Sequence, residues 1–558
     1  MVNIGTYDFV IVGAGAAGSV LANRLGKDGP WSVLVLEAGG SDWSPLHLVP
    51  AGKLFTLGNP RYDWRFRTEP DPSRLDRSET WPRGKVVGGS TTINGLFYVR
   101  GNPDDFDLWA RLGNEGWSYA DVLPHFRDLE SYAGQGDPAY RGTHGALRVS
   151  DVPSPHWLSD RFVQAAGETG IAANTDYNGR VQEGAALAQT TIHGGFRQSA
   201  ARAFLHPARR SGRVRLESGA LVDRITFEGS RARGVEFLQA GQRKTVTARR
   251  EIIVCAGAIG SPCLLMRSGI GPAAELSRLG IPATARLPGV GKNLQEHAGI
   301  WIVQGLQSGI HTANMDYNAL GVARQLLRYV MTRGGPVGTP TAQALAFVRT
   351  APDERTPDVQ IHFMPMGYRF VDSTMEILKT PAIMAVPSVN RPESRGELTL
   401  SSTNPEDPPR IQPRLLEARR DVERLTAACR LVRRIFAAPS FADVVTVESF
   451  PGPAIESDEQ WENVLRERVA PIYHIAGTCK MGTDPHAVVS PDLTVHGVAG
   501  LRVADSSVMP VITSGNTNAP TLMIASRAAE MIVRDHKAAE SHSAPDRVGL
   551  RPASSACR

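Results

Sequence analysis

The sequence predicts an α/β protein of two joined domains, one built on a parallel βαβ unit and one with a different sheet. Three observations predict this. A strand, a glycine-rich turn, a helix and a second strand follow one another at the start of the chain. Residues 213–256 read as short alternating strands that return to a buried strand. Residues 311–461 alternate helical stretches and strands between Pro-rich turns, which predicts the second domain.

Length and composition agree with this fold class. The chain has 558 residues, and single cores stop growing near ~250–300 residues. Apolar residues make up 42% and charged residues 21%, with 55 Gly and 39 Pro, which excludes disordered, fibrous and coiled-coil classes. The net charge is +5, but the basic residues are mostly scattered Arg. Nucleic-acid binders concentrate their charge, so we expect no nucleic-acid partner, while weak attraction to an anionic membrane stays open.

Cysteine use and hydropathy bear on the compartment. The five cysteines form no CxxC pair and no Cys/His metal spacing, so we expect a reducing compartment and no metal. The first apolar run, Phe9 to Val12, leads straight into a glycine motif and belongs to the fold. The stretch Ile252–Met266 is too short and interrupted to span a bilayer. We expect a soluble cytoplasmic protein without a transmembrane segment, and peripheral association with the inner membrane stays open.

The opening segment reads YDFVIVGAGAAG and carries the first chemical signal. Gly13 permits a tight turn, Gly15 lets the backbone approach a pyrophosphate, and Gly18 lets helix and strand pack closely. Glu37 ends the second strand, where a carboxylate meets a ribose hydroxyl. Together these features predict a dinucleotide site. The acid disfavours NADP, but the motif alone does not separate NAD from FAD.

A second glycine-rich segment, Arg83–Gly95, follows a long irregular excursion over residues 41–83. It combines a glycine pair, three hydroxyls and an Asn. A flexible loop is the simple interpretation, but a backbone-lined loop against a flat cofactor has the same composition. Further along, Ser261 and Pro262 are typical of an N-cap and first residue of a helix.

The remaining elements are assigned from periodicity. We expect helices at Ala319–Met331 and Thr521–Val533, and strands at Val359–Phe363 and Gly396–Leu400. The tail from 536 to 558 is polar and aperiodic, which predicts disorder.

His474 lies among Gly and small residues, and a polar cluster follows at Ser514–Thr521. A lone His is more often structural than catalytic, so spacing alone makes this pair only a candidate site. Pro520 and Thr521 are expected to open the last helix, whose N-terminus would stabilise negative charge on a flavin.

Several blocks occur in one order along the chain. They are YDFVIVGAGAAG, VLEAGG, RGKVVGGSTTINGLFYVRG, DLWA, GAIGSPCLLMRSGIGP, LPGVGKNLQEH, YHIAGTCKMG, and LRVADSSVMP with NTNAPTLMIASRAAE. On these blocks the sequence resembles the glucose–methanol–choline (GMC) family of FAD-dependent oxidoreductases from about residue 5 to 535. Its general likeness is to choline dehydrogenase-like alcohol dehydrogenases.

The resemblance implies a Rossmann-like FAD-binding domain of discontinuous segments, 1–158, 205–310 and 462–535. It also implies a substrate-binding domain, 159–204 and 311–461, with a roughly six-stranded antiparallel sheet backed by helices. Residues 536–558 are the expected disordered tail.

The implied function is oxidation of an alcohol to a carbonyl, with FAD as cofactor. His474 is implied as the general base near flavin N5 and Asn518 as the second polar residue. Asn518 is preferred to Asn516 because its separation of 44 residues from His474 resembles the family's. The implied cofactor-binding residues are Gly13, Gly15, Ala16, Ala17, Gly18, Glu37, Ala38, Gly84, Val87, Gly89, Ser90, Asn94, Gly95, Val222, Ala256, Asp505, Ser506, Asn518, Ala519 and Thr521.

Two departures from the family pattern matter. Ile93 stands where some members carry a His that tethers FAD, so we expect non-covalent FAD. Gln343 stands where choline dehydrogenase-like sequences carry a Glu, which counts against choline. An apolar pocket for a primary aliphatic or aromatic alcohol is expected from a set of aromatic and Met residues: Trp64, Phe66, Phe97, Tyr98, Phe363, Met364 and Met366.

Alternatives stay open. The electron acceptor is a quinone, a carrier or O2, with a dehydrogenase favoured on general likeness, and the oligomeric state is undetermined. A non-redox or unusual flavoenzyme, similar to hydroxynitrile lyase or to a light-driven fatty-acid decarboxylase, is a second hypothesis. A NAD-dependent Rossmann enzyme is disfavoured by the loop Gly88–Asn94.

Overall fold

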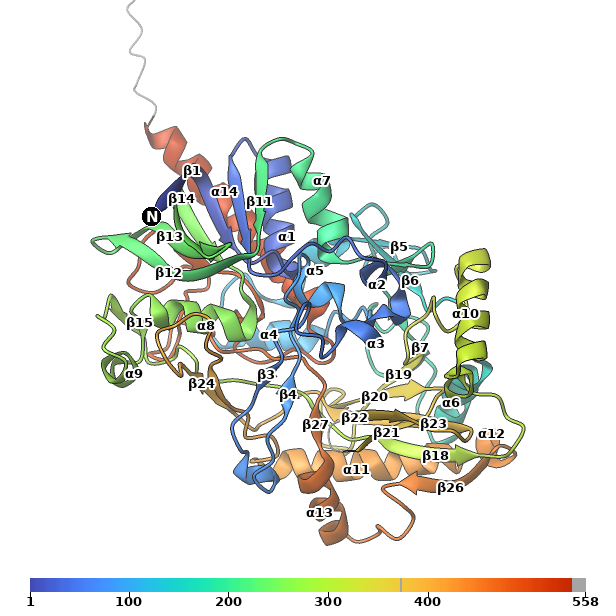
Figure 1. Ribbon diagram of the computed structural model, residues 1–558. Coiled ribbons are helices and arrows are strands. Elements are labelled where there is room, and N and C mark those ends of the chain that lie inside the picture. Colours follow the sequence, from blue (N-terminus) through green and yellow to red (C-terminus); the bar gives the residue numbers. More distant parts are fainter. Residues whose placement is uncertain (372–373, 544–558) are drawn as a thin grey trace, which may run out of the picture.

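The computed structural model describes residues 1–371 and 374–543. It contains two large sheets (Figure 1). A seven-stranded mixed sheet lies near the two ends of the described chain, and an eight-stranded sheet lies at the opposite end of the molecule. The mixed α/β fold predicted from the sequence is confirmed.

The first sheet has the order β11-β2-β1-β14-β13-β12, with β28 paired to β14. β1 (Val2–Val12), β2 (Val33–Glu37), β11 (Val214–Ser218) and β28 (Leu501–Val503) join it in parallel. β12 (Ala220–Glu228), β13 (Arg231–Gln239) and β14 (Gln242–Val254) form the antiparallel meander that the alternating pattern predicted. The helix predicted after the glycine turn is α1 (Ala16–Ala22), which continues as a π-helix to Lys27.

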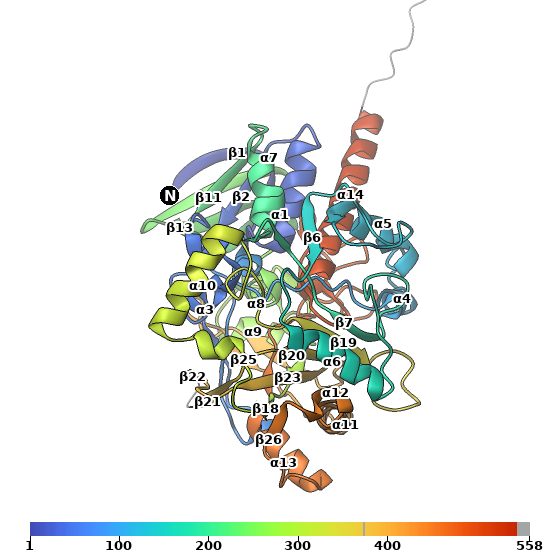
Figure 2. The same cartoon turned by 90° about the vertical axis from the view of Figure 1, so that its right-hand side faces the viewer.

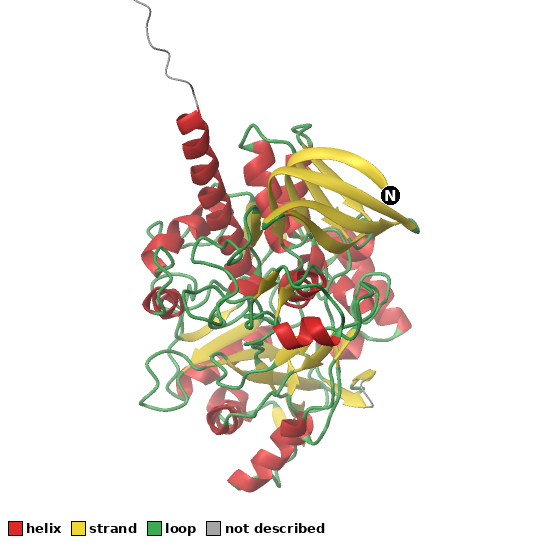
Figure 3. Ribbon diagram, turned by 90° about the vertical axis from the view of Figure 1, so that its left-hand side faces the viewer, coloured by secondary structure: helices red, strands yellow, loops and turns green. Residues whose placement is uncertain are grey.

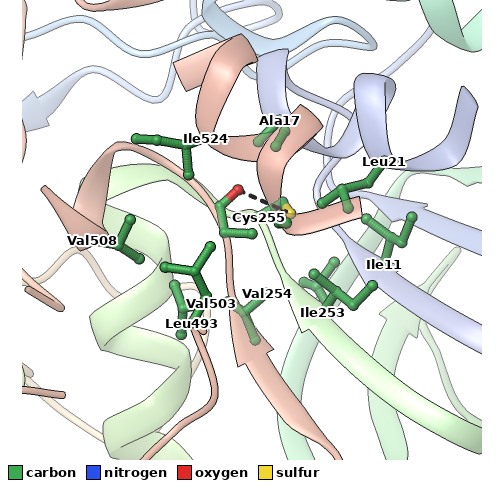
Figure 4. Close-up of a cluster of buried hydrophobic side chains, with 14 of the residues drawn as sticks. Ile11, Ala17, Leu21, Ile253, Val254, Cys255, Leu493, Val503, Val508 and Ile524 are labelled. Carbon is green, nitrogen blue, oxygen red and sulfur yellow. Dashed lines mark hydrogen bonds between the residues drawn. The ribbon is translucent and has the colours of Figure 1, made fainter. Parts of the chain in front are cut away.

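The core of this domain lies between the sheet and the helices α1 and α14 (Asn518–Ser543). Figure 4 shows Ile11, Ile253, Val254 and Val503 from the parallel strands packed toward helical side chains. The thiol of Cys255 lies 3.6 Å from the carbonyl oxygen of Ala504. Burial of these apolar residues fixes the strand ends that carry the site.

The second sheet is antiparallel, with the order β26-β18-β23-β20-β19-β7 and two short strands, β17 and β27, at its side. Helices α6 (Trp157–Glu168) and α11 (Arg419–Phe436) cover one face, where Phe162 stacks on Phe363. Its strands are β7 (Gly184–Leu187), β17 (Ala298–Gly299), β18 (Ile302–Leu306), β19 (Ala344–Val348), β20 (Val359–Met364), β23 (Ala382–Val389), β26 (Val445–Phe450) and β27 (Ala470–Pro471). β17, β18 and β27 therefore come from segments that the sequence grouped with the first domain, and the domain division stays a prediction.

The other helices cluster between and around the sheets, with long loops between them (Figure 3). They are α2 (Pro45–Leu48), α3 (Lys53–Thr56), α4 (Pro103–Arg111), α5 (Tyr119–Leu129), α7 (His206–Arg209), α8 (Gly257–Arg267), α9 (Ala273–Arg278), α10 (Ala319–Thr332), α12 (Pro439–Ala442) and α13 (Asp458–Arg468).

The other strands form small two- and three-stranded sheets. They are β3 (Phe66–Arg67), β4 (Thr80–Trp81), β5 (Glu130–Tyr132), β6 (Leu147–Asp151), β8 (Gln189–Thr190), β9 (Ile192–His193), β10 (Phe196–Arg197), β15 (Ile270–Gly271), β16 (Ala285–Arg286), β21 (Tyr368–Val371), β22 (Thr374–Ile377), β24 (Glu397–Thr399) and β25 (Arg410–Gln412).

Three local predictions need correction. α8 begins at Gly257, four residues before the predicted cap, and Ser261 instead donates from its hydroxyl to Asp505 within the helix. α14 begins at Asn518 rather than Thr521 and runs to Ser543, so residues 536–543 of the predicted disordered tail are helical. The rest of that tail, 544–558, lies outside the described residues.

Within residues 1–371 and 374–543, none of the helices has the length and hydropathy of a membrane span. The same residues contain no group of His, Cys, Asp and Glu side chains arranged to hold a metal ion. Four cysteines, all buried, are free thiols: Cys255, Cys263, Cys429 and Cys479.

Candidate active site

The glycine turn between β1 and α1 is shaped so that only glycine fits. Gly13 has φ +105°, and a Cβ there would lie 2.3 Å from the carbonyl oxygen of Cys255. A Cβ on Gly18 would lie 1.9 Å from the Gly13 carbonyl oxygen. Gly15 is the N-cap of α1 and has no side chain that could accept from the N–H groups of the first helical turn. These main-chain donors are therefore left for a ligand. This geometry fits a diphosphate at a helix N-terminus.

Glu37 closes this turn from the end of β2. Its carboxylate accepts hydrogen bonds from the main-chain N–H of Ala14 at 2.9 Å and of Gly39 at 2.8 Å. Burial raises the pKa of Glu37 to about 7, opposed by those two N–H groups. A buried carboxylate thus lies directly against the glycine turn, at the end of the second strand, and its contact to a ribose stays a prediction.

The second glycine-rich segment lies directly against the first. Gly89 has φ +54°, and a Cβ there would lie 2.8 Å from the Cα of Gly15. The main-chain N–H of Gly84 donates to Ser90 Oγ at 3.1 Å. Two loops remote in sequence thus form one backbone-lined cradle, as the sequence predicted for a flat cofactor.

Asn94, near the end of this loop, is fixed by a buried cation. Arg197 donates from Nη1 to Asn94 Oδ1 at 2.8 Å and to the Asn94 carbonyl oxygen at 2.9 Å. Arg197 is fully buried, and burial lowers its pKa to about 9. The hydrogen bonds from Arg197, a residue that the sequence pattern did not single out, therefore stabilise the conformation of this loop.

Asp505 connects the end of β28 to the start of α8. Its carboxylate accepts from the main-chain N–H groups of Gly257 and Ser507, both at 2.8 Å, and from Ser261 Oγ at 2.5 Å. Burial raises the pKa of Asp505, opposed by these donors. Ser506 donates to the Ile475 carbonyl oxygen at 3.2 Å and links this turn to the segment of His474.

The other predicted cofactor residues occupy the same cradle elements or their neighbours, at the starts of α1 and α14, on the two loops, and beside α8. They are Ala16, Ala17, Ala38, Val87, Gly95, Val222, Ala256, Ala519 and Thr521. The close glycine approaches and the helix N-termini of the cradle fit the diphosphate of FAD, and each residue's contact to it stays a prediction.

His474 lies at the centre of a buried polar cluster. Its Nε2 is 2.8 Å from Asn516 Nδ2, and its Nδ1 is 2.9 Å from Nδ1 of His297. Asn516 Oδ1 accepts from Gln360 Nε2 at 3.2 Å, which orients the amide so that Nδ2 donates to His474. Nε2 of His474 is therefore the unprotonated nitrogen, and Nδ1 carries its proton toward His297.

Burial holds the pKa of His474 well below its usual value, and the neighbouring His297, His362 and Arg83 lower this pKa further. Burial also lowers the pKa of His297 to about 3 and of His362 to about 4. The three imidazoles are thus neutral near pH 7, and Nε2 of His474 is an unprotonated acceptor.

The sequence preferred Asn518 as the partner of His474, but the side chain in contact is Asn516. Asn518 is the first residue of α14, two positions further on and partly buried. A turn at Ser514–Thr517 brings Asn516 inward, which the count of residues from His474 did not predict. Asn516 also hydrogen-bonds with His362 and so touches two imidazoles.

Glu296 supports His474 from the main-chain side. Its Oε1 accepts from the His474 N–H at 2.7 Å, and its Oε2 lies 3.8 Å from Arg83 Nη2. Burial raises the pKa of Glu296 to about 7, opposed by the charge of Arg83. A carboxyl group poised to ionise thus holds the main chain of His474.

Lys53 of α3 brings a cation to the same region. Its Nζ donates to Thr341 Oγ1 at 2.9 Å, and a Cβ on Gly95 would lie 3.9 Å from it. Burial lowers the pKa of Lys53 to about 8, and its charge in turn lowers the pKa of His362. Phe97 packs edge-on against His362 at 5.2 Å between centroids.

The predicted apolar pocket is partly formed. Phe97, Met364 and Met366 join one apolar cluster on the face of the second sheet that also holds Trp301 and Met384. The other candidates lie elsewhere: Trp64 and Phe66 stack on each other, Tyr98 belongs to the first core, and Phe363 lies in the core under α6 and α11.

Gln343 caps the start of α6 through its side-chain oxygen. Its Oε1 accepts from the His156 N–H at 2.6 Å and from Ser159 Oγ at 3.2 Å. Its lack of charge therefore carries no conclusion about choline.

The sequence did not single out Lys53, Arg197, Glu296, His297 or His362. A usable signal existed for one pair, because Glu296 and His297 end the block LPGVGKNLQEH. The others come from strands and short helices whose proximity arises only in the fold.

Comparison with known proteins gives a consistent result. Two family models described as GMC oxidoreductase match residues 7–299 and 392–525. The chain is 41% identical to an oxygen-dependent choline dehydrogenase of Rhizobium etli, over 96% of this chain and 97% of that protein. It is 42% identical to the enzyme of that name from Brucella canis, with the same coverage.

Solved structures agree. Pyridoxine 4-oxidase from Mesorbium loti superimposes with a TM-score of 0.85 at 29% identity, covering 94% of this chain and 99% of its own. A variant of formate oxidase from Aspergillus oryzae RIB40 gives a TM-score of 0.89 at 25% identity, covering 96% and 100%.

Proposed function

Because the chain belongs to the GMC oxidoreductase family and is an FAD-dependent oxidoreductase acting on CH–OH groups, we propose that His474 accepts the hydroxyl proton of a primary alcohol during its oxidation to the aldehyde. One observation carries this assignment. His474 is a buried neutral imidazole whose unprotonated Nε2 accepts a hydrogen bond from Asn516, so its lone pair points to the side on which a substrate hydroxyl group could replace that donor.

The chemistry requires such a group. An alcohol carbon releases hydride only as its hydroxyl group loses a proton, and a neutral imidazole is suited to accept it. When bound, FAD accepts the hydride. The amide of Asn516 donates toward the position that a substrate oxygen would share, which stabilises negative charge there. Asn518 remains the second candidate for this role.

His474 becomes positively charged once it holds the proton. Glu296 lies behind it and accepts its main-chain N–H, so an ionised Glu296 stabilises the imidazolium. Nδ1 of His297 accepts a hydrogen bond from Nδ1–H of His474, which keeps the proton on Nδ1 and leaves Nε2 unprotonated. Both are positioning residues in this proposal.

The substrate is proposed to be an uncharged primary aliphatic or aromatic alcohol. The Met-rich cluster with Phe97 offers an apolar wall, and Lys53 places a positive charge near His362. A quaternary ammonium group would be repelled there. Choline is the second candidate, favoured by the identity to choline dehydrogenases.

The acceptor is proposed to be a quinone or a carrier, with O2 as the alternative, and the enzyme is proposed to work at a membrane surface. FAD is proposed to be held without a covalent bond, because Ile93 offers no nucleophilic atom.

Anaerobic mixing of the holoenzyme with a panel of primary alcohols, followed through flavin absorbance, tests this function. The wild type should be bleached, and His474→Ala should keep FAD but react about 10²–10⁴-fold more slowly. Bleaching of the variant at the wild-type rate would overturn His474 as the base. No bleaching of the wild type by any alcohol would favour a lyase-like or decarboxylase-like flavoenzyme.

A further inference from the structure

Helix α10 packs on the protein through a partly polar stripe and leaves its apolar face exposed to solvent. Its buried residues are Gly321, Gln325 and Tyr329, a narrow and partly polar stripe at four-residue spacing. Such helices normally bury their apolar side chains. Here the apolar side chains point outward: Leu320, Val322, Leu326, Leu327, Val330 and Met331, of which Leu320 is 81% and Met331 77% exposed.

A second exposed apolar segment lies beside α10. Residues 43–57 carry Trp43, 77% exposed, and Phe55, 64% exposed. The main-chain N–H of Ala51 donates to the carbonyl oxygen of Val337, which follows α10, at 3.1 Å. Figure 1 places α10 at the right-hand margin of the molecule, with α2 and α3 between it and the centre, and Figure 2 shows α3 and α10 close together in projection. We call α10 together with residues 43–57 the docking surface.

The charges of α10 are of one sign. The helix carries Arg324 and Arg328, no Asp or Glu, and Arg333 as its C-cap. Arg324 pairs with the nearby Asp316. Arg333 lies over the rings of Phe196 and Tyr329, at 5.0 and 5.5 Å from their centroids. An exposed apolar face edged by Arg is the pattern of helices that lie in the plane of an anionic bilayer.

The docking surface also adjoins the candidate active site. Lys53 belongs to α3, and its Nζ reaches Thr341 in the segment that leads from α10 to β19. Ala342, the next residue, belongs to the apolar cluster of Met364 and Met366. A membrane against this surface would therefore border the apolar cluster of Met364 and Met366, beside which the alcohol is expected.

We propose that this protein binds the surface of an anionic phospholipid bilayer through α10 and residues 43–57. The apolar side chains enter the headgroup boundary and Arg324, Arg328 and Arg333 contact lipid phosphates. A consequence for catalysis is that a lipophilic alcohol or a quinone passes between the bilayer and the candidate active site. This consequence rests on the proposed function.

Vesicle co-sedimentation of the holoenzyme tests the binding without any turnover. We expect binding to vesicles of phosphatidylcholine with phosphatidylglycerol, and at least about tenfold weaker binding to phosphatidylcholine alone. Leu327→Glu with Val330→Glu should weaken binding at least about tenfold, and Arg324→Gln with Arg328→Gln about fivefold per charge. Raised salt should weaken the wild type further.

The matched control is Val447→Glu on β26, another exposed Val, 62% exposed and outside the docking surface. It should bind like the wild type. Each variant must keep its flavin absorbance and its anaerobic bleaching by a water-soluble alcohol, which shows that the fold is intact.

Failure of wild-type binding to phosphatidylglycerol vesicles would overturn the proposal, as would equal loss in the Val447→Glu control. A concentration-dependent dimer that Leu327→Glu dissociates, without vesicle binding, would assign the surface to a second copy of this chain and also overturn it. Vesicle binding without bleaching by any alcohol would uphold the docking surface and refute the proposed function, so the two are separable.

Discussion

His297 and His474 face each other through their Nδ1 atoms at 2.9 Å. A neutral pair at this distance shares a single proton, since two protonated nitrogens would repel and two bare ones would form no hydrogen bond. The donor from Asn516 leaves Nε2 of His474 without a proton, so the shared proton belongs to Nδ1 of His474 and His297 is the acceptor. The reactive tautomer is thus determined by a residue on the far side of the ring.

His297→Ala should slow anaerobic flavin reduction about tenfold, less than the loss of His474 itself. The variant removes the acceptor for Nδ1 and the buried imidazole whose presence helps to lower the pKa of His474. The pKa of His474 should then rise, and the fall in rate on the acid side should begin at a higher pH than in the wild type.

His297→Asn supplies an amide oxygen in place of Nδ1 and should recover most of the rate. If His297→Ala slows the reaction without moving the pH profile, and Asn gives no recovery, His297 serves only to fill space.

The two asparagines of the NTN segment give a direct comparison. Asn516→Ala should reduce the rate of anaerobic reduction by about tenfold to a hundredfold, because it removes the donor at 2.8 Å from Nε2. Asn518→Ala, at the first turn of α14, should have the smaller effect. The reverse order, measured by rapid mixing with retained FAD, would restore the residue that the sequence spacing favoured.

The nucleotide half of the site was predictable because its signals are local. Gly13 and Gly18 each reveal a backbone requirement through their residue type alone, and Glu37 follows at the end of the next strand. The parallel strands around them are continuous apolar runs, which periodicity detects. These residues therefore lie where the sequence placed them.

The catalytic half depends on contacts that no local pattern encodes. His297 precedes β17, His362 lies in β20 and Lys53 in α3, and only the tertiary fold brings them near His474. The start of α8 was misassigned for the same reason, because its capping carboxylate is the distant Asp505. Periodicity located α10 well, but the repeat of apolar residues does not say which face is turned outward.

Glu37 should make FAD affinity depend on pH. Burial raises its pKa to about 7, so below that pH the carboxyl group is mostly protonated. A carboxylate that accepts hydroxyl groups must be ionised, so binding of FAD releases a proton and the affinity should increase from about pH 6 to pH 8.

Glu37→Gln should bind FAD about tenfold more weakly at pH 8 and lose this pH dependence. Quenching of flavin fluorescence in titrations across the pH range gives both quantities. An affinity that is flat with pH in the wild type would refute the role of Glu37.

Lys53 should set the charge preference for substrates. We compare choline with its uncharged isostere, 3,3-dimethylbutan-1-ol, through the ratio of their kcat/KM values. Lys53→Met should raise the ratio in favour of choline about tenfold, because about 1.4 kcal/mol is a modest part of the repulsion between two unit charges in a protein interior. In the wild type the pKa of Lys53 is lowered to about 8. Its charge is present below that pH and lost above it, so the ratio should increase between about pH 7 and pH 9 in the wild type only.

Lys27→Met is the matched control for this prediction, since it removes the same charge from an exposed position at the end of the π-helix after α1. It should leave the ratio and its pH dependence unchanged. Because the isostere has the same shape as choline, a change confined to the ratio isolates charge from size. A ratio that Lys53→Met leaves unaltered at pH 7 would show that the ammonium group does not face the substrate, and choline would then become the favoured alcohol.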